Sequence, residues 1–146
     1  MAHKYAPKRI TGSFQPSGGP SIQFHGFMDG TFLDLDFNED AVSAHVGSDG
    51  NVTGTLSANM TATLTMTFVQ GSDTNDALSN YVPNGRTSFF PSGTLTIQDL
   101  NGTTLASDNG AWIMKMAKIT FGKEVTGREW KFYMPNATIF AGGDGL

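Results

Sequence analysis

The most constraining feature of this sequence is the segment 60–69, in which threonine and apolar residues alternate strictly. Thr61, Thr63, Thr65 and Thr67 fall on one side of the pattern, and Ala62, Leu64, Met66 and Phe68 fall on the other. A helix would scatter both sets around its axis, whereas a strand sends successive side chains to opposite faces. The segment therefore predicts a β-strand with one polar face and one apolar face. A second strand of this kind is predicted at 31–38, where Leu33, Leu35 and Phe37 alternate with Asp34, Asp36 and Asn38.

The remaining segments predict further short strands and one helix. Extended stretches are expected at 9–14, 41–46, 94–98, 103–106, 111–116, 130–134 and 137–140. Asp49-Gly50 predicts a type I′ hairpin turn, with the return strand at 60–69. Ser72 or Asp73 can cap a helix that runs to Pro83. Short strands around one helix, without a βαβ rhythm, predict an all-β fold: an antiparallel sandwich or barrel. We expect one domain over 1–146, with an extended N-terminal arm over 1–20 and a mobile tail over 142–146.

Composition excludes several classes of function. The chain has 146 residues, a formal net charge of −4 and no cysteine. The missing basic surplus argues against tight nucleic-acid binding, which depends on neutralising phosphates. The start of the chain shows no apolar signal sequence, and no apolar run approaches the about 18 residues of a membrane helix. We therefore expect a protein made in the cytoplasm, without a membrane partner.

Candidate catalytic and metal-binding residues are few and isolated. His3, His25 and His45 are far apart in sequence, and none has a second ligand at metal-site spacing. Asp34 and Asp36 share a strand face, but no nucleophile or basic partner adjoins them. We expect no catalytic residue, cofactor or metal, and no enzymatic activity. Trp112 and Trp130 are predicted to lie in the core. Phe89 and Phe90 cannot both point inward from a strand, so at least one is expected to contact a partner.

Several motifs follow one another along the chain in a characteristic order: Asp29-Gly30-Thr31-Phe32, Asn38-Glu39-Asp40, Val46-Gly47-Ser48-Asp49-Gly50, Ser72-Asp73-Thr74-Asn75-Asp76-Ala77-Leu78, Gln98-Asp99-Leu100-Asn101-Gly102-Thr103, Trp112, Phe121-Gly122-Lys123-Glu124-Val125 and Arg128-Glu129-Trp130. In their order and spacing, these motifs resemble the tail tube proteins of contractile-tailed bacteriophages. The resemblance extends from about residue 4 to residue 143. Two features depart from the family pattern: the Pro/Gly-rich segment 16–20 and the loop that carries Phe89 and Phe90.

The resemblance implies a structural virion protein. Six subunits would form each ring, and each subunit would add strands to one continuous inner β-barrel. The rings would stack into a tube inside a contractile sheath, and DNA would pass through the bore without specific binding. Implied partners are further copies of the chain, the sheath protein, the baseplate and tail terminator proteins, and the tape measure protein.

Within this scheme, the two-faced strands suggest which residues line the bore. We expect Asp34, Asp36, Thr63, Thr65 and Thr67 to face the lumen, and Leu33, Leu35, Leu64, Met66 and Phe68 to face the core. Contacts between subunits or rings are expected at Phe89, Phe90, Lys4, Lys8 and Arg9. Two alternatives stay open: a tube subunit of a DNA-free, phage-tail-like bacteriocin, and a monomeric β-sandwich that binds carbohydrate through Trp112, Trp130 or Phe89.

Overall fold

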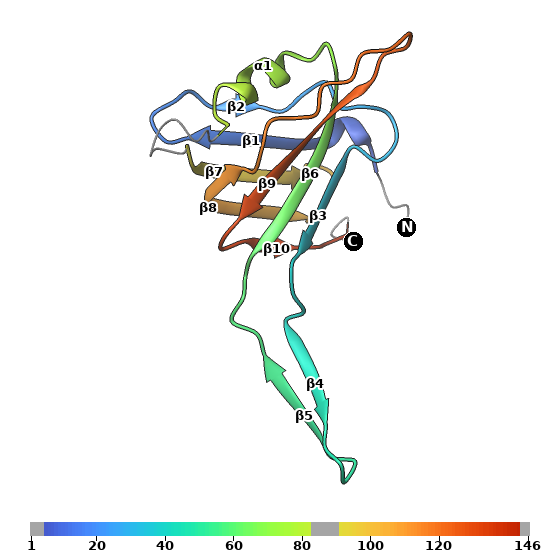
Figure 1. Cartoon of the computed structure of the whole chain (residues 1–146), viewed down its shortest axis with the longest axis vertical. Helices are drawn as coiled ribbons and strands as arrows, with labels where there is room; N and C mark the ends of the chain where they lie inside the picture. The colour runs from blue at the N-terminus through green and yellow to red at the C-terminus, as the bar shows by residue number, and fades with distance from the viewer. Residues whose placement is uncertain (1–4, 83–90, 144–146) are drawn as a thin grey trace.

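The structure, a computed structural model, describes residues 5–82 and 91–143, and these residues form antiparallel strands and one short α-helix (Figure 1). A 3₁₀ turn, η1 (Pro7–Arg9), comes first, and the helix α1 spans Asp73–Ser79. The strands are β1 (Ile10–Pro16), β2 (Ile22–Gln23), β3 (Leu33–Phe37), β4 (Val42–Val46), β5 (Val52–Leu56), β6 (Ala62–Val69), β7 (Gly93–Asp99), β8 (Leu105–Ile113), β9 (Gly127–Met134) and β10 (Thr138–Phe140). The predicted fold class, all-β with one short helix, is confirmed.

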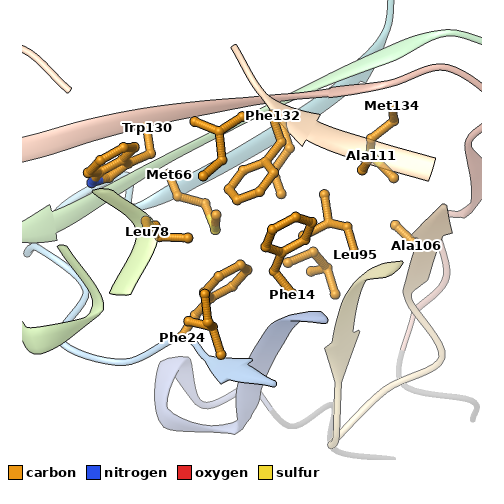
Figure 2. Close-up of a cluster of buried hydrophobic side chains, with 14 of the residues drawn as sticks. Phe14, Phe24, Met66, Leu78, Leu95, Ala106, Ala111, Trp130, Phe132 and Met134 are labelled. Carbon is orange, nitrogen blue, oxygen red and sulfur yellow. The ribbon is translucent and has the colours of Figure 1, made fainter. Parts of the chain in front are cut away.

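The strands form two layers that share β8. The strand order is β2-β1-β7-β8-β9-β6-β3, with β10 also paired to β8, and β4 and β5 form a separate two-stranded sheet. In Figure 1, β1, β7, β8 and β10 run across the direction of β3, β6 and β9. The apolar faces of the two groups pack on each other (Figure 2). Phe14 of β1 meets Phe132 of β9 edge-on, with ring centroids 5.1 Å apart, and both rings are fully buried.

A buried aspartate shapes the corner at which β8 passes from one layer to the other. The register between β7 and β8 shifts between Gly93 and Leu95, whose partners are Ala111 and Asp108, so β8 holds one extra residue there. Oδ1 of Asp108 accepts a hydrogen bond from the Gly110 N–H at 2.7 Å, and Oδ2 accepts one from the Asn136 N–H at 2.7 Å. Bulges bend a strand and increase its twist. The carboxylate thus ties the bulge to the loop before β10.

The helix is held at its start by its cap and in its middle by a buried amide. Ser72 is the N-cap, and its hydroxyl accepts from the Thr74 N–H at 3.2 Å, as predicted. Asn75 accepts a hydrogen bond from the Trp130 indole N–H at 2.9 Å and donates one to the Val69 carbonyl at 2.9 Å. A buried indole N–H needs such a partner. The prediction that Trp130 belongs to the core is confirmed, because the side chain is 1% exposed.

The strand predicted at 9–14 is confirmed as β1 (Ile10–Pro16), an inner strand between β2 and β7 that contains the buried Phe14. One local prediction needs correction. The separate strands expected at 103–106 and 111–116 are one strand, β8, which ends at Ile113. In the expected mobile tail, the Gly142 and Gly143 carbonyls accept bonds from the Thr104 hydroxyl and the Thr103 N–H.

The hairpin at Asp49-Gly50 exists, but its turn is not type I′. Gly50 has φ +87°, whereas no non-glycine residue of the described chain has positive φ, so Asp49 cannot occupy a type I′ position. The Gly47 N–H bonds to the Asn51 carbonyl and the Gly50 N–H bonds to the Gly47 carbonyl. This is a three-residue loop that ends in a left-handed glycine. The return strand is β5, which was not predicted, and β6 pairs instead with β3.

Replacing Asp108 by asparagine tests the corner. An amide has one accepting oxygen, so one of the two backbone N–H groups would face an NH₂ donor and lose its partner. We expect Asp108→Asn to lower the free energy of unfolding by about 1–3 kcal/mol, measured by urea titration. The exposed Asp76→Asn is the matched control and should change stability by less than about 0.5 kcal/mol. Equal stability of the two variants would contradict the assigned role.

Candidate assembly surfaces

The polar face of β3, β6 and β9 is the first candidate surface. Register places Asp34 opposite Thr65 and Asp36 opposite Thr63, and the side chains of directly paired residues share a face. The five residues expected to line a lumen therefore lie together on one face: Asp34, Asp36, Thr63, Thr65 and Thr67. The opposite face carries Leu64, Met66 and Phe68, which are fully buried. As predicted, polar side chains lie on one face of the sheet and apolar side chains on the other. No contact shows what the polar face meets.

Strand β9 adds charged and aromatic residues to this face that sequence reasoning missed. Thr63, Thr65 and Thr67 pair across β6 with Tyr133, Lys131 and Glu129, respectively. The Lys131 ammonium lies 4.0 Å from the Glu129 carboxylate. The face is therefore of mixed charge rather than uniformly acidic. The signal was present in the sequence, because Glu129, Lys131 and Tyr133 alternate with three buried residues: Trp130, Phe132 and Met134.

Trp112 also belongs to the polar face, so its predicted place in the core is wrong. Its neighbours Ala111 and Ile113 are fully buried, and alternation along β8 turns Trp112 to the opposite side. Trp112 pairs with Tyr133, and the two rings stack with centroids 5.1 Å apart at 30° between planes. The aromatic pair thus extends the polar face towards β8.

The outer edge of β3 is open to a further strand. β3 ends the sheet, and in the part of the chain that the structure describes it pairs only with β6. The Asn38 N–H bonds to the Thr61 carbonyl, and the Phe32 carbonyl accepts from Thr67. Because backbone groups alternate in direction along an antiparallel strand, those of Leu33, Leu35 and Phe37 point to the open edge. Natural sheets rarely leave such an edge uncovered.

The hairpin β4–β5 is the second candidate surface. It projects from the two-layer body at one end of the longest axis (Figure 1) and pairs only with itself in the described chain. Direct pairs Val42–Leu56, Ala44–Gly54 and Val46–Val52 make one face apolar, while Ser43–Thr55 and His45–Thr53 make the other polar. All of these residues are exposed, Leu56 by 78%. A lone two-stranded hairpin is marginally stable in water, and an exposed apolar face is typical of a surface that binds a partner.

The loop between β8 and β9, residues 114–126, is the third candidate surface. It carries five exposed apolar side chains: Met114, Met116, Ile119, Phe121 and Val125. Lys115, Lys118 and Lys123 are also exposed. The Arg128 guanidinium carbon lies 5.2 Å from the centre of the Phe121 ring, a distance typical of a cation–π contact. Phe121 is nevertheless 77% exposed, so most of the ring stays available to a partner.

Of the residues predicted to contact other subunits, two are described. Lys8 and Arg9 lie in η1 and are exposed. Lys4, Phe89 and Phe90 lie outside the described residues. The subunit contacts expected at all five residues therefore stay predictions.

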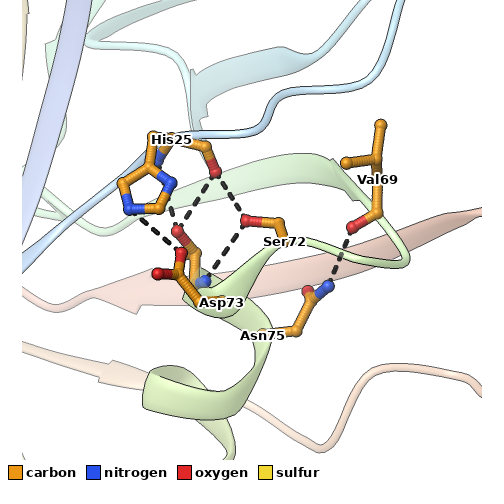
Figure 3. Close-up of polar contacts among 6 residues, drawn as sticks. His25, Val69, Ser72, Asp73 and Asn75 are labelled. Atoms are coloured by element: carbon orange, nitrogen blue, oxygen red, sulfur yellow. Dashed lines mark hydrogen bonds and ion pairs between the residues drawn. The ribbon is translucent and has the colours of Figure 1, made fainter.

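A histidine–aspartate–serine cluster beside α1 is a structural latch and has no catalytic geometry (Figure 3). The His25 Nε2 lies 3.0 Å from Asp73 Oδ1, with both side chains more than half exposed. The Ser72 hydroxyl donates to the His25 carbonyl at 2.8 Å and not to the imidazole, so no base activates it. These bonds fix the segment before β3 to the helix start. Within residues 5–82 and 91–143, no group of three or more His, Asp or Glu is placed to hold a metal, and no helix is long and apolar enough to cross a membrane.

Comparison with solved structures indicates the class of assembly in which this fold occurs. A chain of the sheath/tube terminator of an extracellular contractile injection system, PVC, superimposes with a TM-score of 0.61 at 14% identity, over 96% of this chain and 99% of that one. A chain of the anti-feeding prophage cap, AFP, which terminates its tube, gives 0.54 at 12% identity, over 96% and 94%. The fold is therefore that of components of contractile, tail-like assemblies.

In sequence, the chain is similar to a bacteriophage protein. It is 27% identical over 143 residues to Structural protein ORF10 of Pseudomonas phage KPP10, which covers 96% of this chain and 83% of that protein. No protein-family model matches the chain. Similarity to a phage structural protein, together with this fold, supports a structural role in a phage or contractile injection system.

Threonine substitutions test whether the apolar hairpin face is free of the body. Val46→Thr with Val52→Thr keeps β-branched side chains and removes apolar surface at two exposed positions. We expect the free energy of unfolding in urea to change by less than about 0.5 kcal/mol. Leu64→Ala is the contrasting control and should cost about 2–5 kcal/mol, because Leu64 is fully buried. A loss above about 1 kcal/mol in the valine pair would mean that this face already packs within the monomer.

Proposed function

We propose that the chain is the tube subunit of a contractile phage tail, in which six copies form a ring and the rings stack into the inner tube. The observation that carries the proposal is a sheet that ends at an unpaired edge and has one polar and one apolar face. β3, β6 and β9 bury an apolar face, expose a polar face and end at the open edge of β3. Joining this edge to a neighbouring copy would continue the sheet and remove the edge, which is the stable solution for a barrel.

The polar face supplies a suitable wall for a DNA channel. Asp34 and Asp36 carry negative charge, Lys131 lies near Glu129, and hydroxyls fill the rows between them. The net charge of these four groups is negative, so phosphate would find no cluster of cations on which to release counterions. The bore would let DNA pass without gripping it. The sheath protein, the baseplate and terminator proteins and the tape measure protein are the partners that this role requires, and the virion tail is its location.

A second candidate is a tube-terminating subunit, favoured by the descriptions of both similar solved structures, the PVC sheath/tube terminator and the AFP cap. The two roles predict different assemblies. A tube subunit extends its own rings indefinitely, whereas a terminator closes after one layer. Negative-stain microscopy of the purified chain, alone and with a baseplate extract as nucleus, separates tubes of many lengths from single rings and from monomers. Monomers under both conditions would favour an independent β-sandwich.

The open edge is tested by Leu35→Pro against Leu35→Ala. Both variants lose the same leucine side chain, but only proline removes the N–H that points to the outer edge of β3. Proline is tolerated on edge strands, so both chains should fold, which near-ultraviolet circular dichroism checks. We expect Leu35→Ala to assemble and Leu35→Pro to remain unassembled in the same microscopy. Normal assembly of the folded proline variant would argue that β3 pairs with no neighbour.

The lumen assignment is tested by Asp34→Lys with Asp36→Lys. Both side chains are exposed on the monomer, so we expect assembly to continue. The bore should then hold added positive charge in every ring and retain DNA, in a manner that weakens as salt rises. The measurement is co-sedimentation of labelled duplex DNA with assembled tubes and, in particles, the rate of DNA ejection, which should fall. Tubes that neither retain DNA nor slow its passage would place these aspartates away from the bore.

A further inference from the structure

Charge is distributed very unevenly along this chain. Residues 10–82 contain no lysine or arginine, and the hairpin with its base carries Glu39, Asp40 and Asp49. The loop 114–126 carries Lys115, Lys118 and Lys123, with Glu124 as its only acid. From these side chains, the hairpin region has a formal charge of −3 (three acids, no Lys or Arg), and the loop has +2 (three lysines less one glutamate).

The two oppositely charged surfaces lie at opposite ends of the molecule. Figure 1 shows the β4–β5 hairpin at one end of the longest axis, and the loop before β9, drawn in orange, at the other. A chain cannot bring its own hairpin to its own loop across the two-layer body. Contact between these surfaces requires a second copy, and two copies in the same orientation, one above the other, bring the hairpin of one to the loop of the next.

Each surface also offers apolar area for the other to cover. The hairpin face carries Val42, Val46, Val52 and Leu56, and the loop carries Met114, Met116, Ile119, Phe121 and Val125. Each combines apolar side chains with a net charge, which is negative in the hairpin region and positive in the loop. Two hairpins or two loops facing each other would bring like charges together, which costs several kcal/mol across an interface, whereas hairpin against loop is attractive.

We propose that the apolar face of the β4–β5 hairpin of one copy docks on the 114–126 loop of the next copy along the tube axis. The contact is heterologous, since it joins two different surfaces, and such contacts propagate into filaments when they do not close. The inference rests on the proposed function, because it names the contact that stacks one ring on the next. In this contact, the negative charges of Glu39 and Asp40 favour a basic partner surface over an acidic one.

The test reverses charges on each side and then on both. Glu39→Lys with Asp40→Lys changes the hairpin base, and Lys118→Glu with Lys123→Glu changes the loop. All four residues are exposed. We expect each pair alone to raise the protein concentration needed for tube growth at least about tenfold, since about 1.4 kcal/mol corresponds to tenfold. The combination of both pairs should restore growth, because the attraction is re-established with inverted sign.

Asp29→Lys is the control, because Asp29 is exposed and belongs to neither the hairpin nor the 114–126 loop. It reverses an acidic charge outside the proposed contact and should leave the critical concentration unchanged. Wild-type tubes should also shorten as salt approaches 1 M, where the screening length falls to about 3 Å.

The outcomes separate the inference from the proposed function. A wild-type chain that never forms tubes or rings contradicts the proposed function, and the inference falls with it. Wild-type tubes together with one-sided variants that grow normally, or a combined variant that stays unassembled while its urea unfolding is unchanged, overturn the inference alone. Restored growth of the combined variant, with both one-sided variants impaired, supports the docking of hairpin on loop.

Discussion

The strict alternation in β6 is the constraint on which the rest of the structure depends. Slipping this strand by one residue would turn every threonine into the core and every apolar side chain into solvent. Burying a hydroxyl without a partner costs about 1–3 kcal/mol, and exposing a buried Leu, Met or Phe forfeits about 1.5–3 kcal/mol. β6 lies between β3 and β9, which alternate in the same phase. The three strands are thereby fixed in one register. Their apolar face packs on β1, and their polar face is not covered by the core.

Features encoded by local pattern were predictable, and features set by distant contacts were not. β3, β6 and the cap of α1 follow from neighbouring residues alone. The direction of Trp112 depends on the bulge in β8, and that bulge is held by a bond from Asn136, which lies 28 residues from Asp108. No local window contains both groups. The type of hairpin turn was misjudged for a different reason: Asp49-Gly50 fits two loop lengths, and the Gly47–Asn51 pairing selected the longer one.

The candidate surfaces divide in the same way. The period of two was sufficient to place the five lumen candidates on one face, and register across β6 then added Glu129, Lys131 and Tyr133. Strand β5 was missed although Val52, Gly54 and Leu56 match Val42, Ala44 and Val46 across the turn. An apolar face predicts burial, but it does not reveal whether the covering surface lies in the same chain. For the polar face, period and register settle which residues lie together, and its place in a bore stays a prediction.

The exposed hairpin and the open edge of β3 pose one physical problem. Each presents unpaired backbone groups or apolar side chains that invite association with any similar strand. Residues 10–82 contain no lysine or arginine, whereas acids lie in and beside the hairpin. Every copy therefore has the same negative charge there, and like charges repel. In the proposed docking, hairpins repel hairpins before assembly, and a surface that joins apolar groups with cations covers them. In the described chain, the 114–126 loop has that composition and lies at the far end of the molecule. One charge pattern can therefore keep free subunits apart and direct the assembly in which they finally meet.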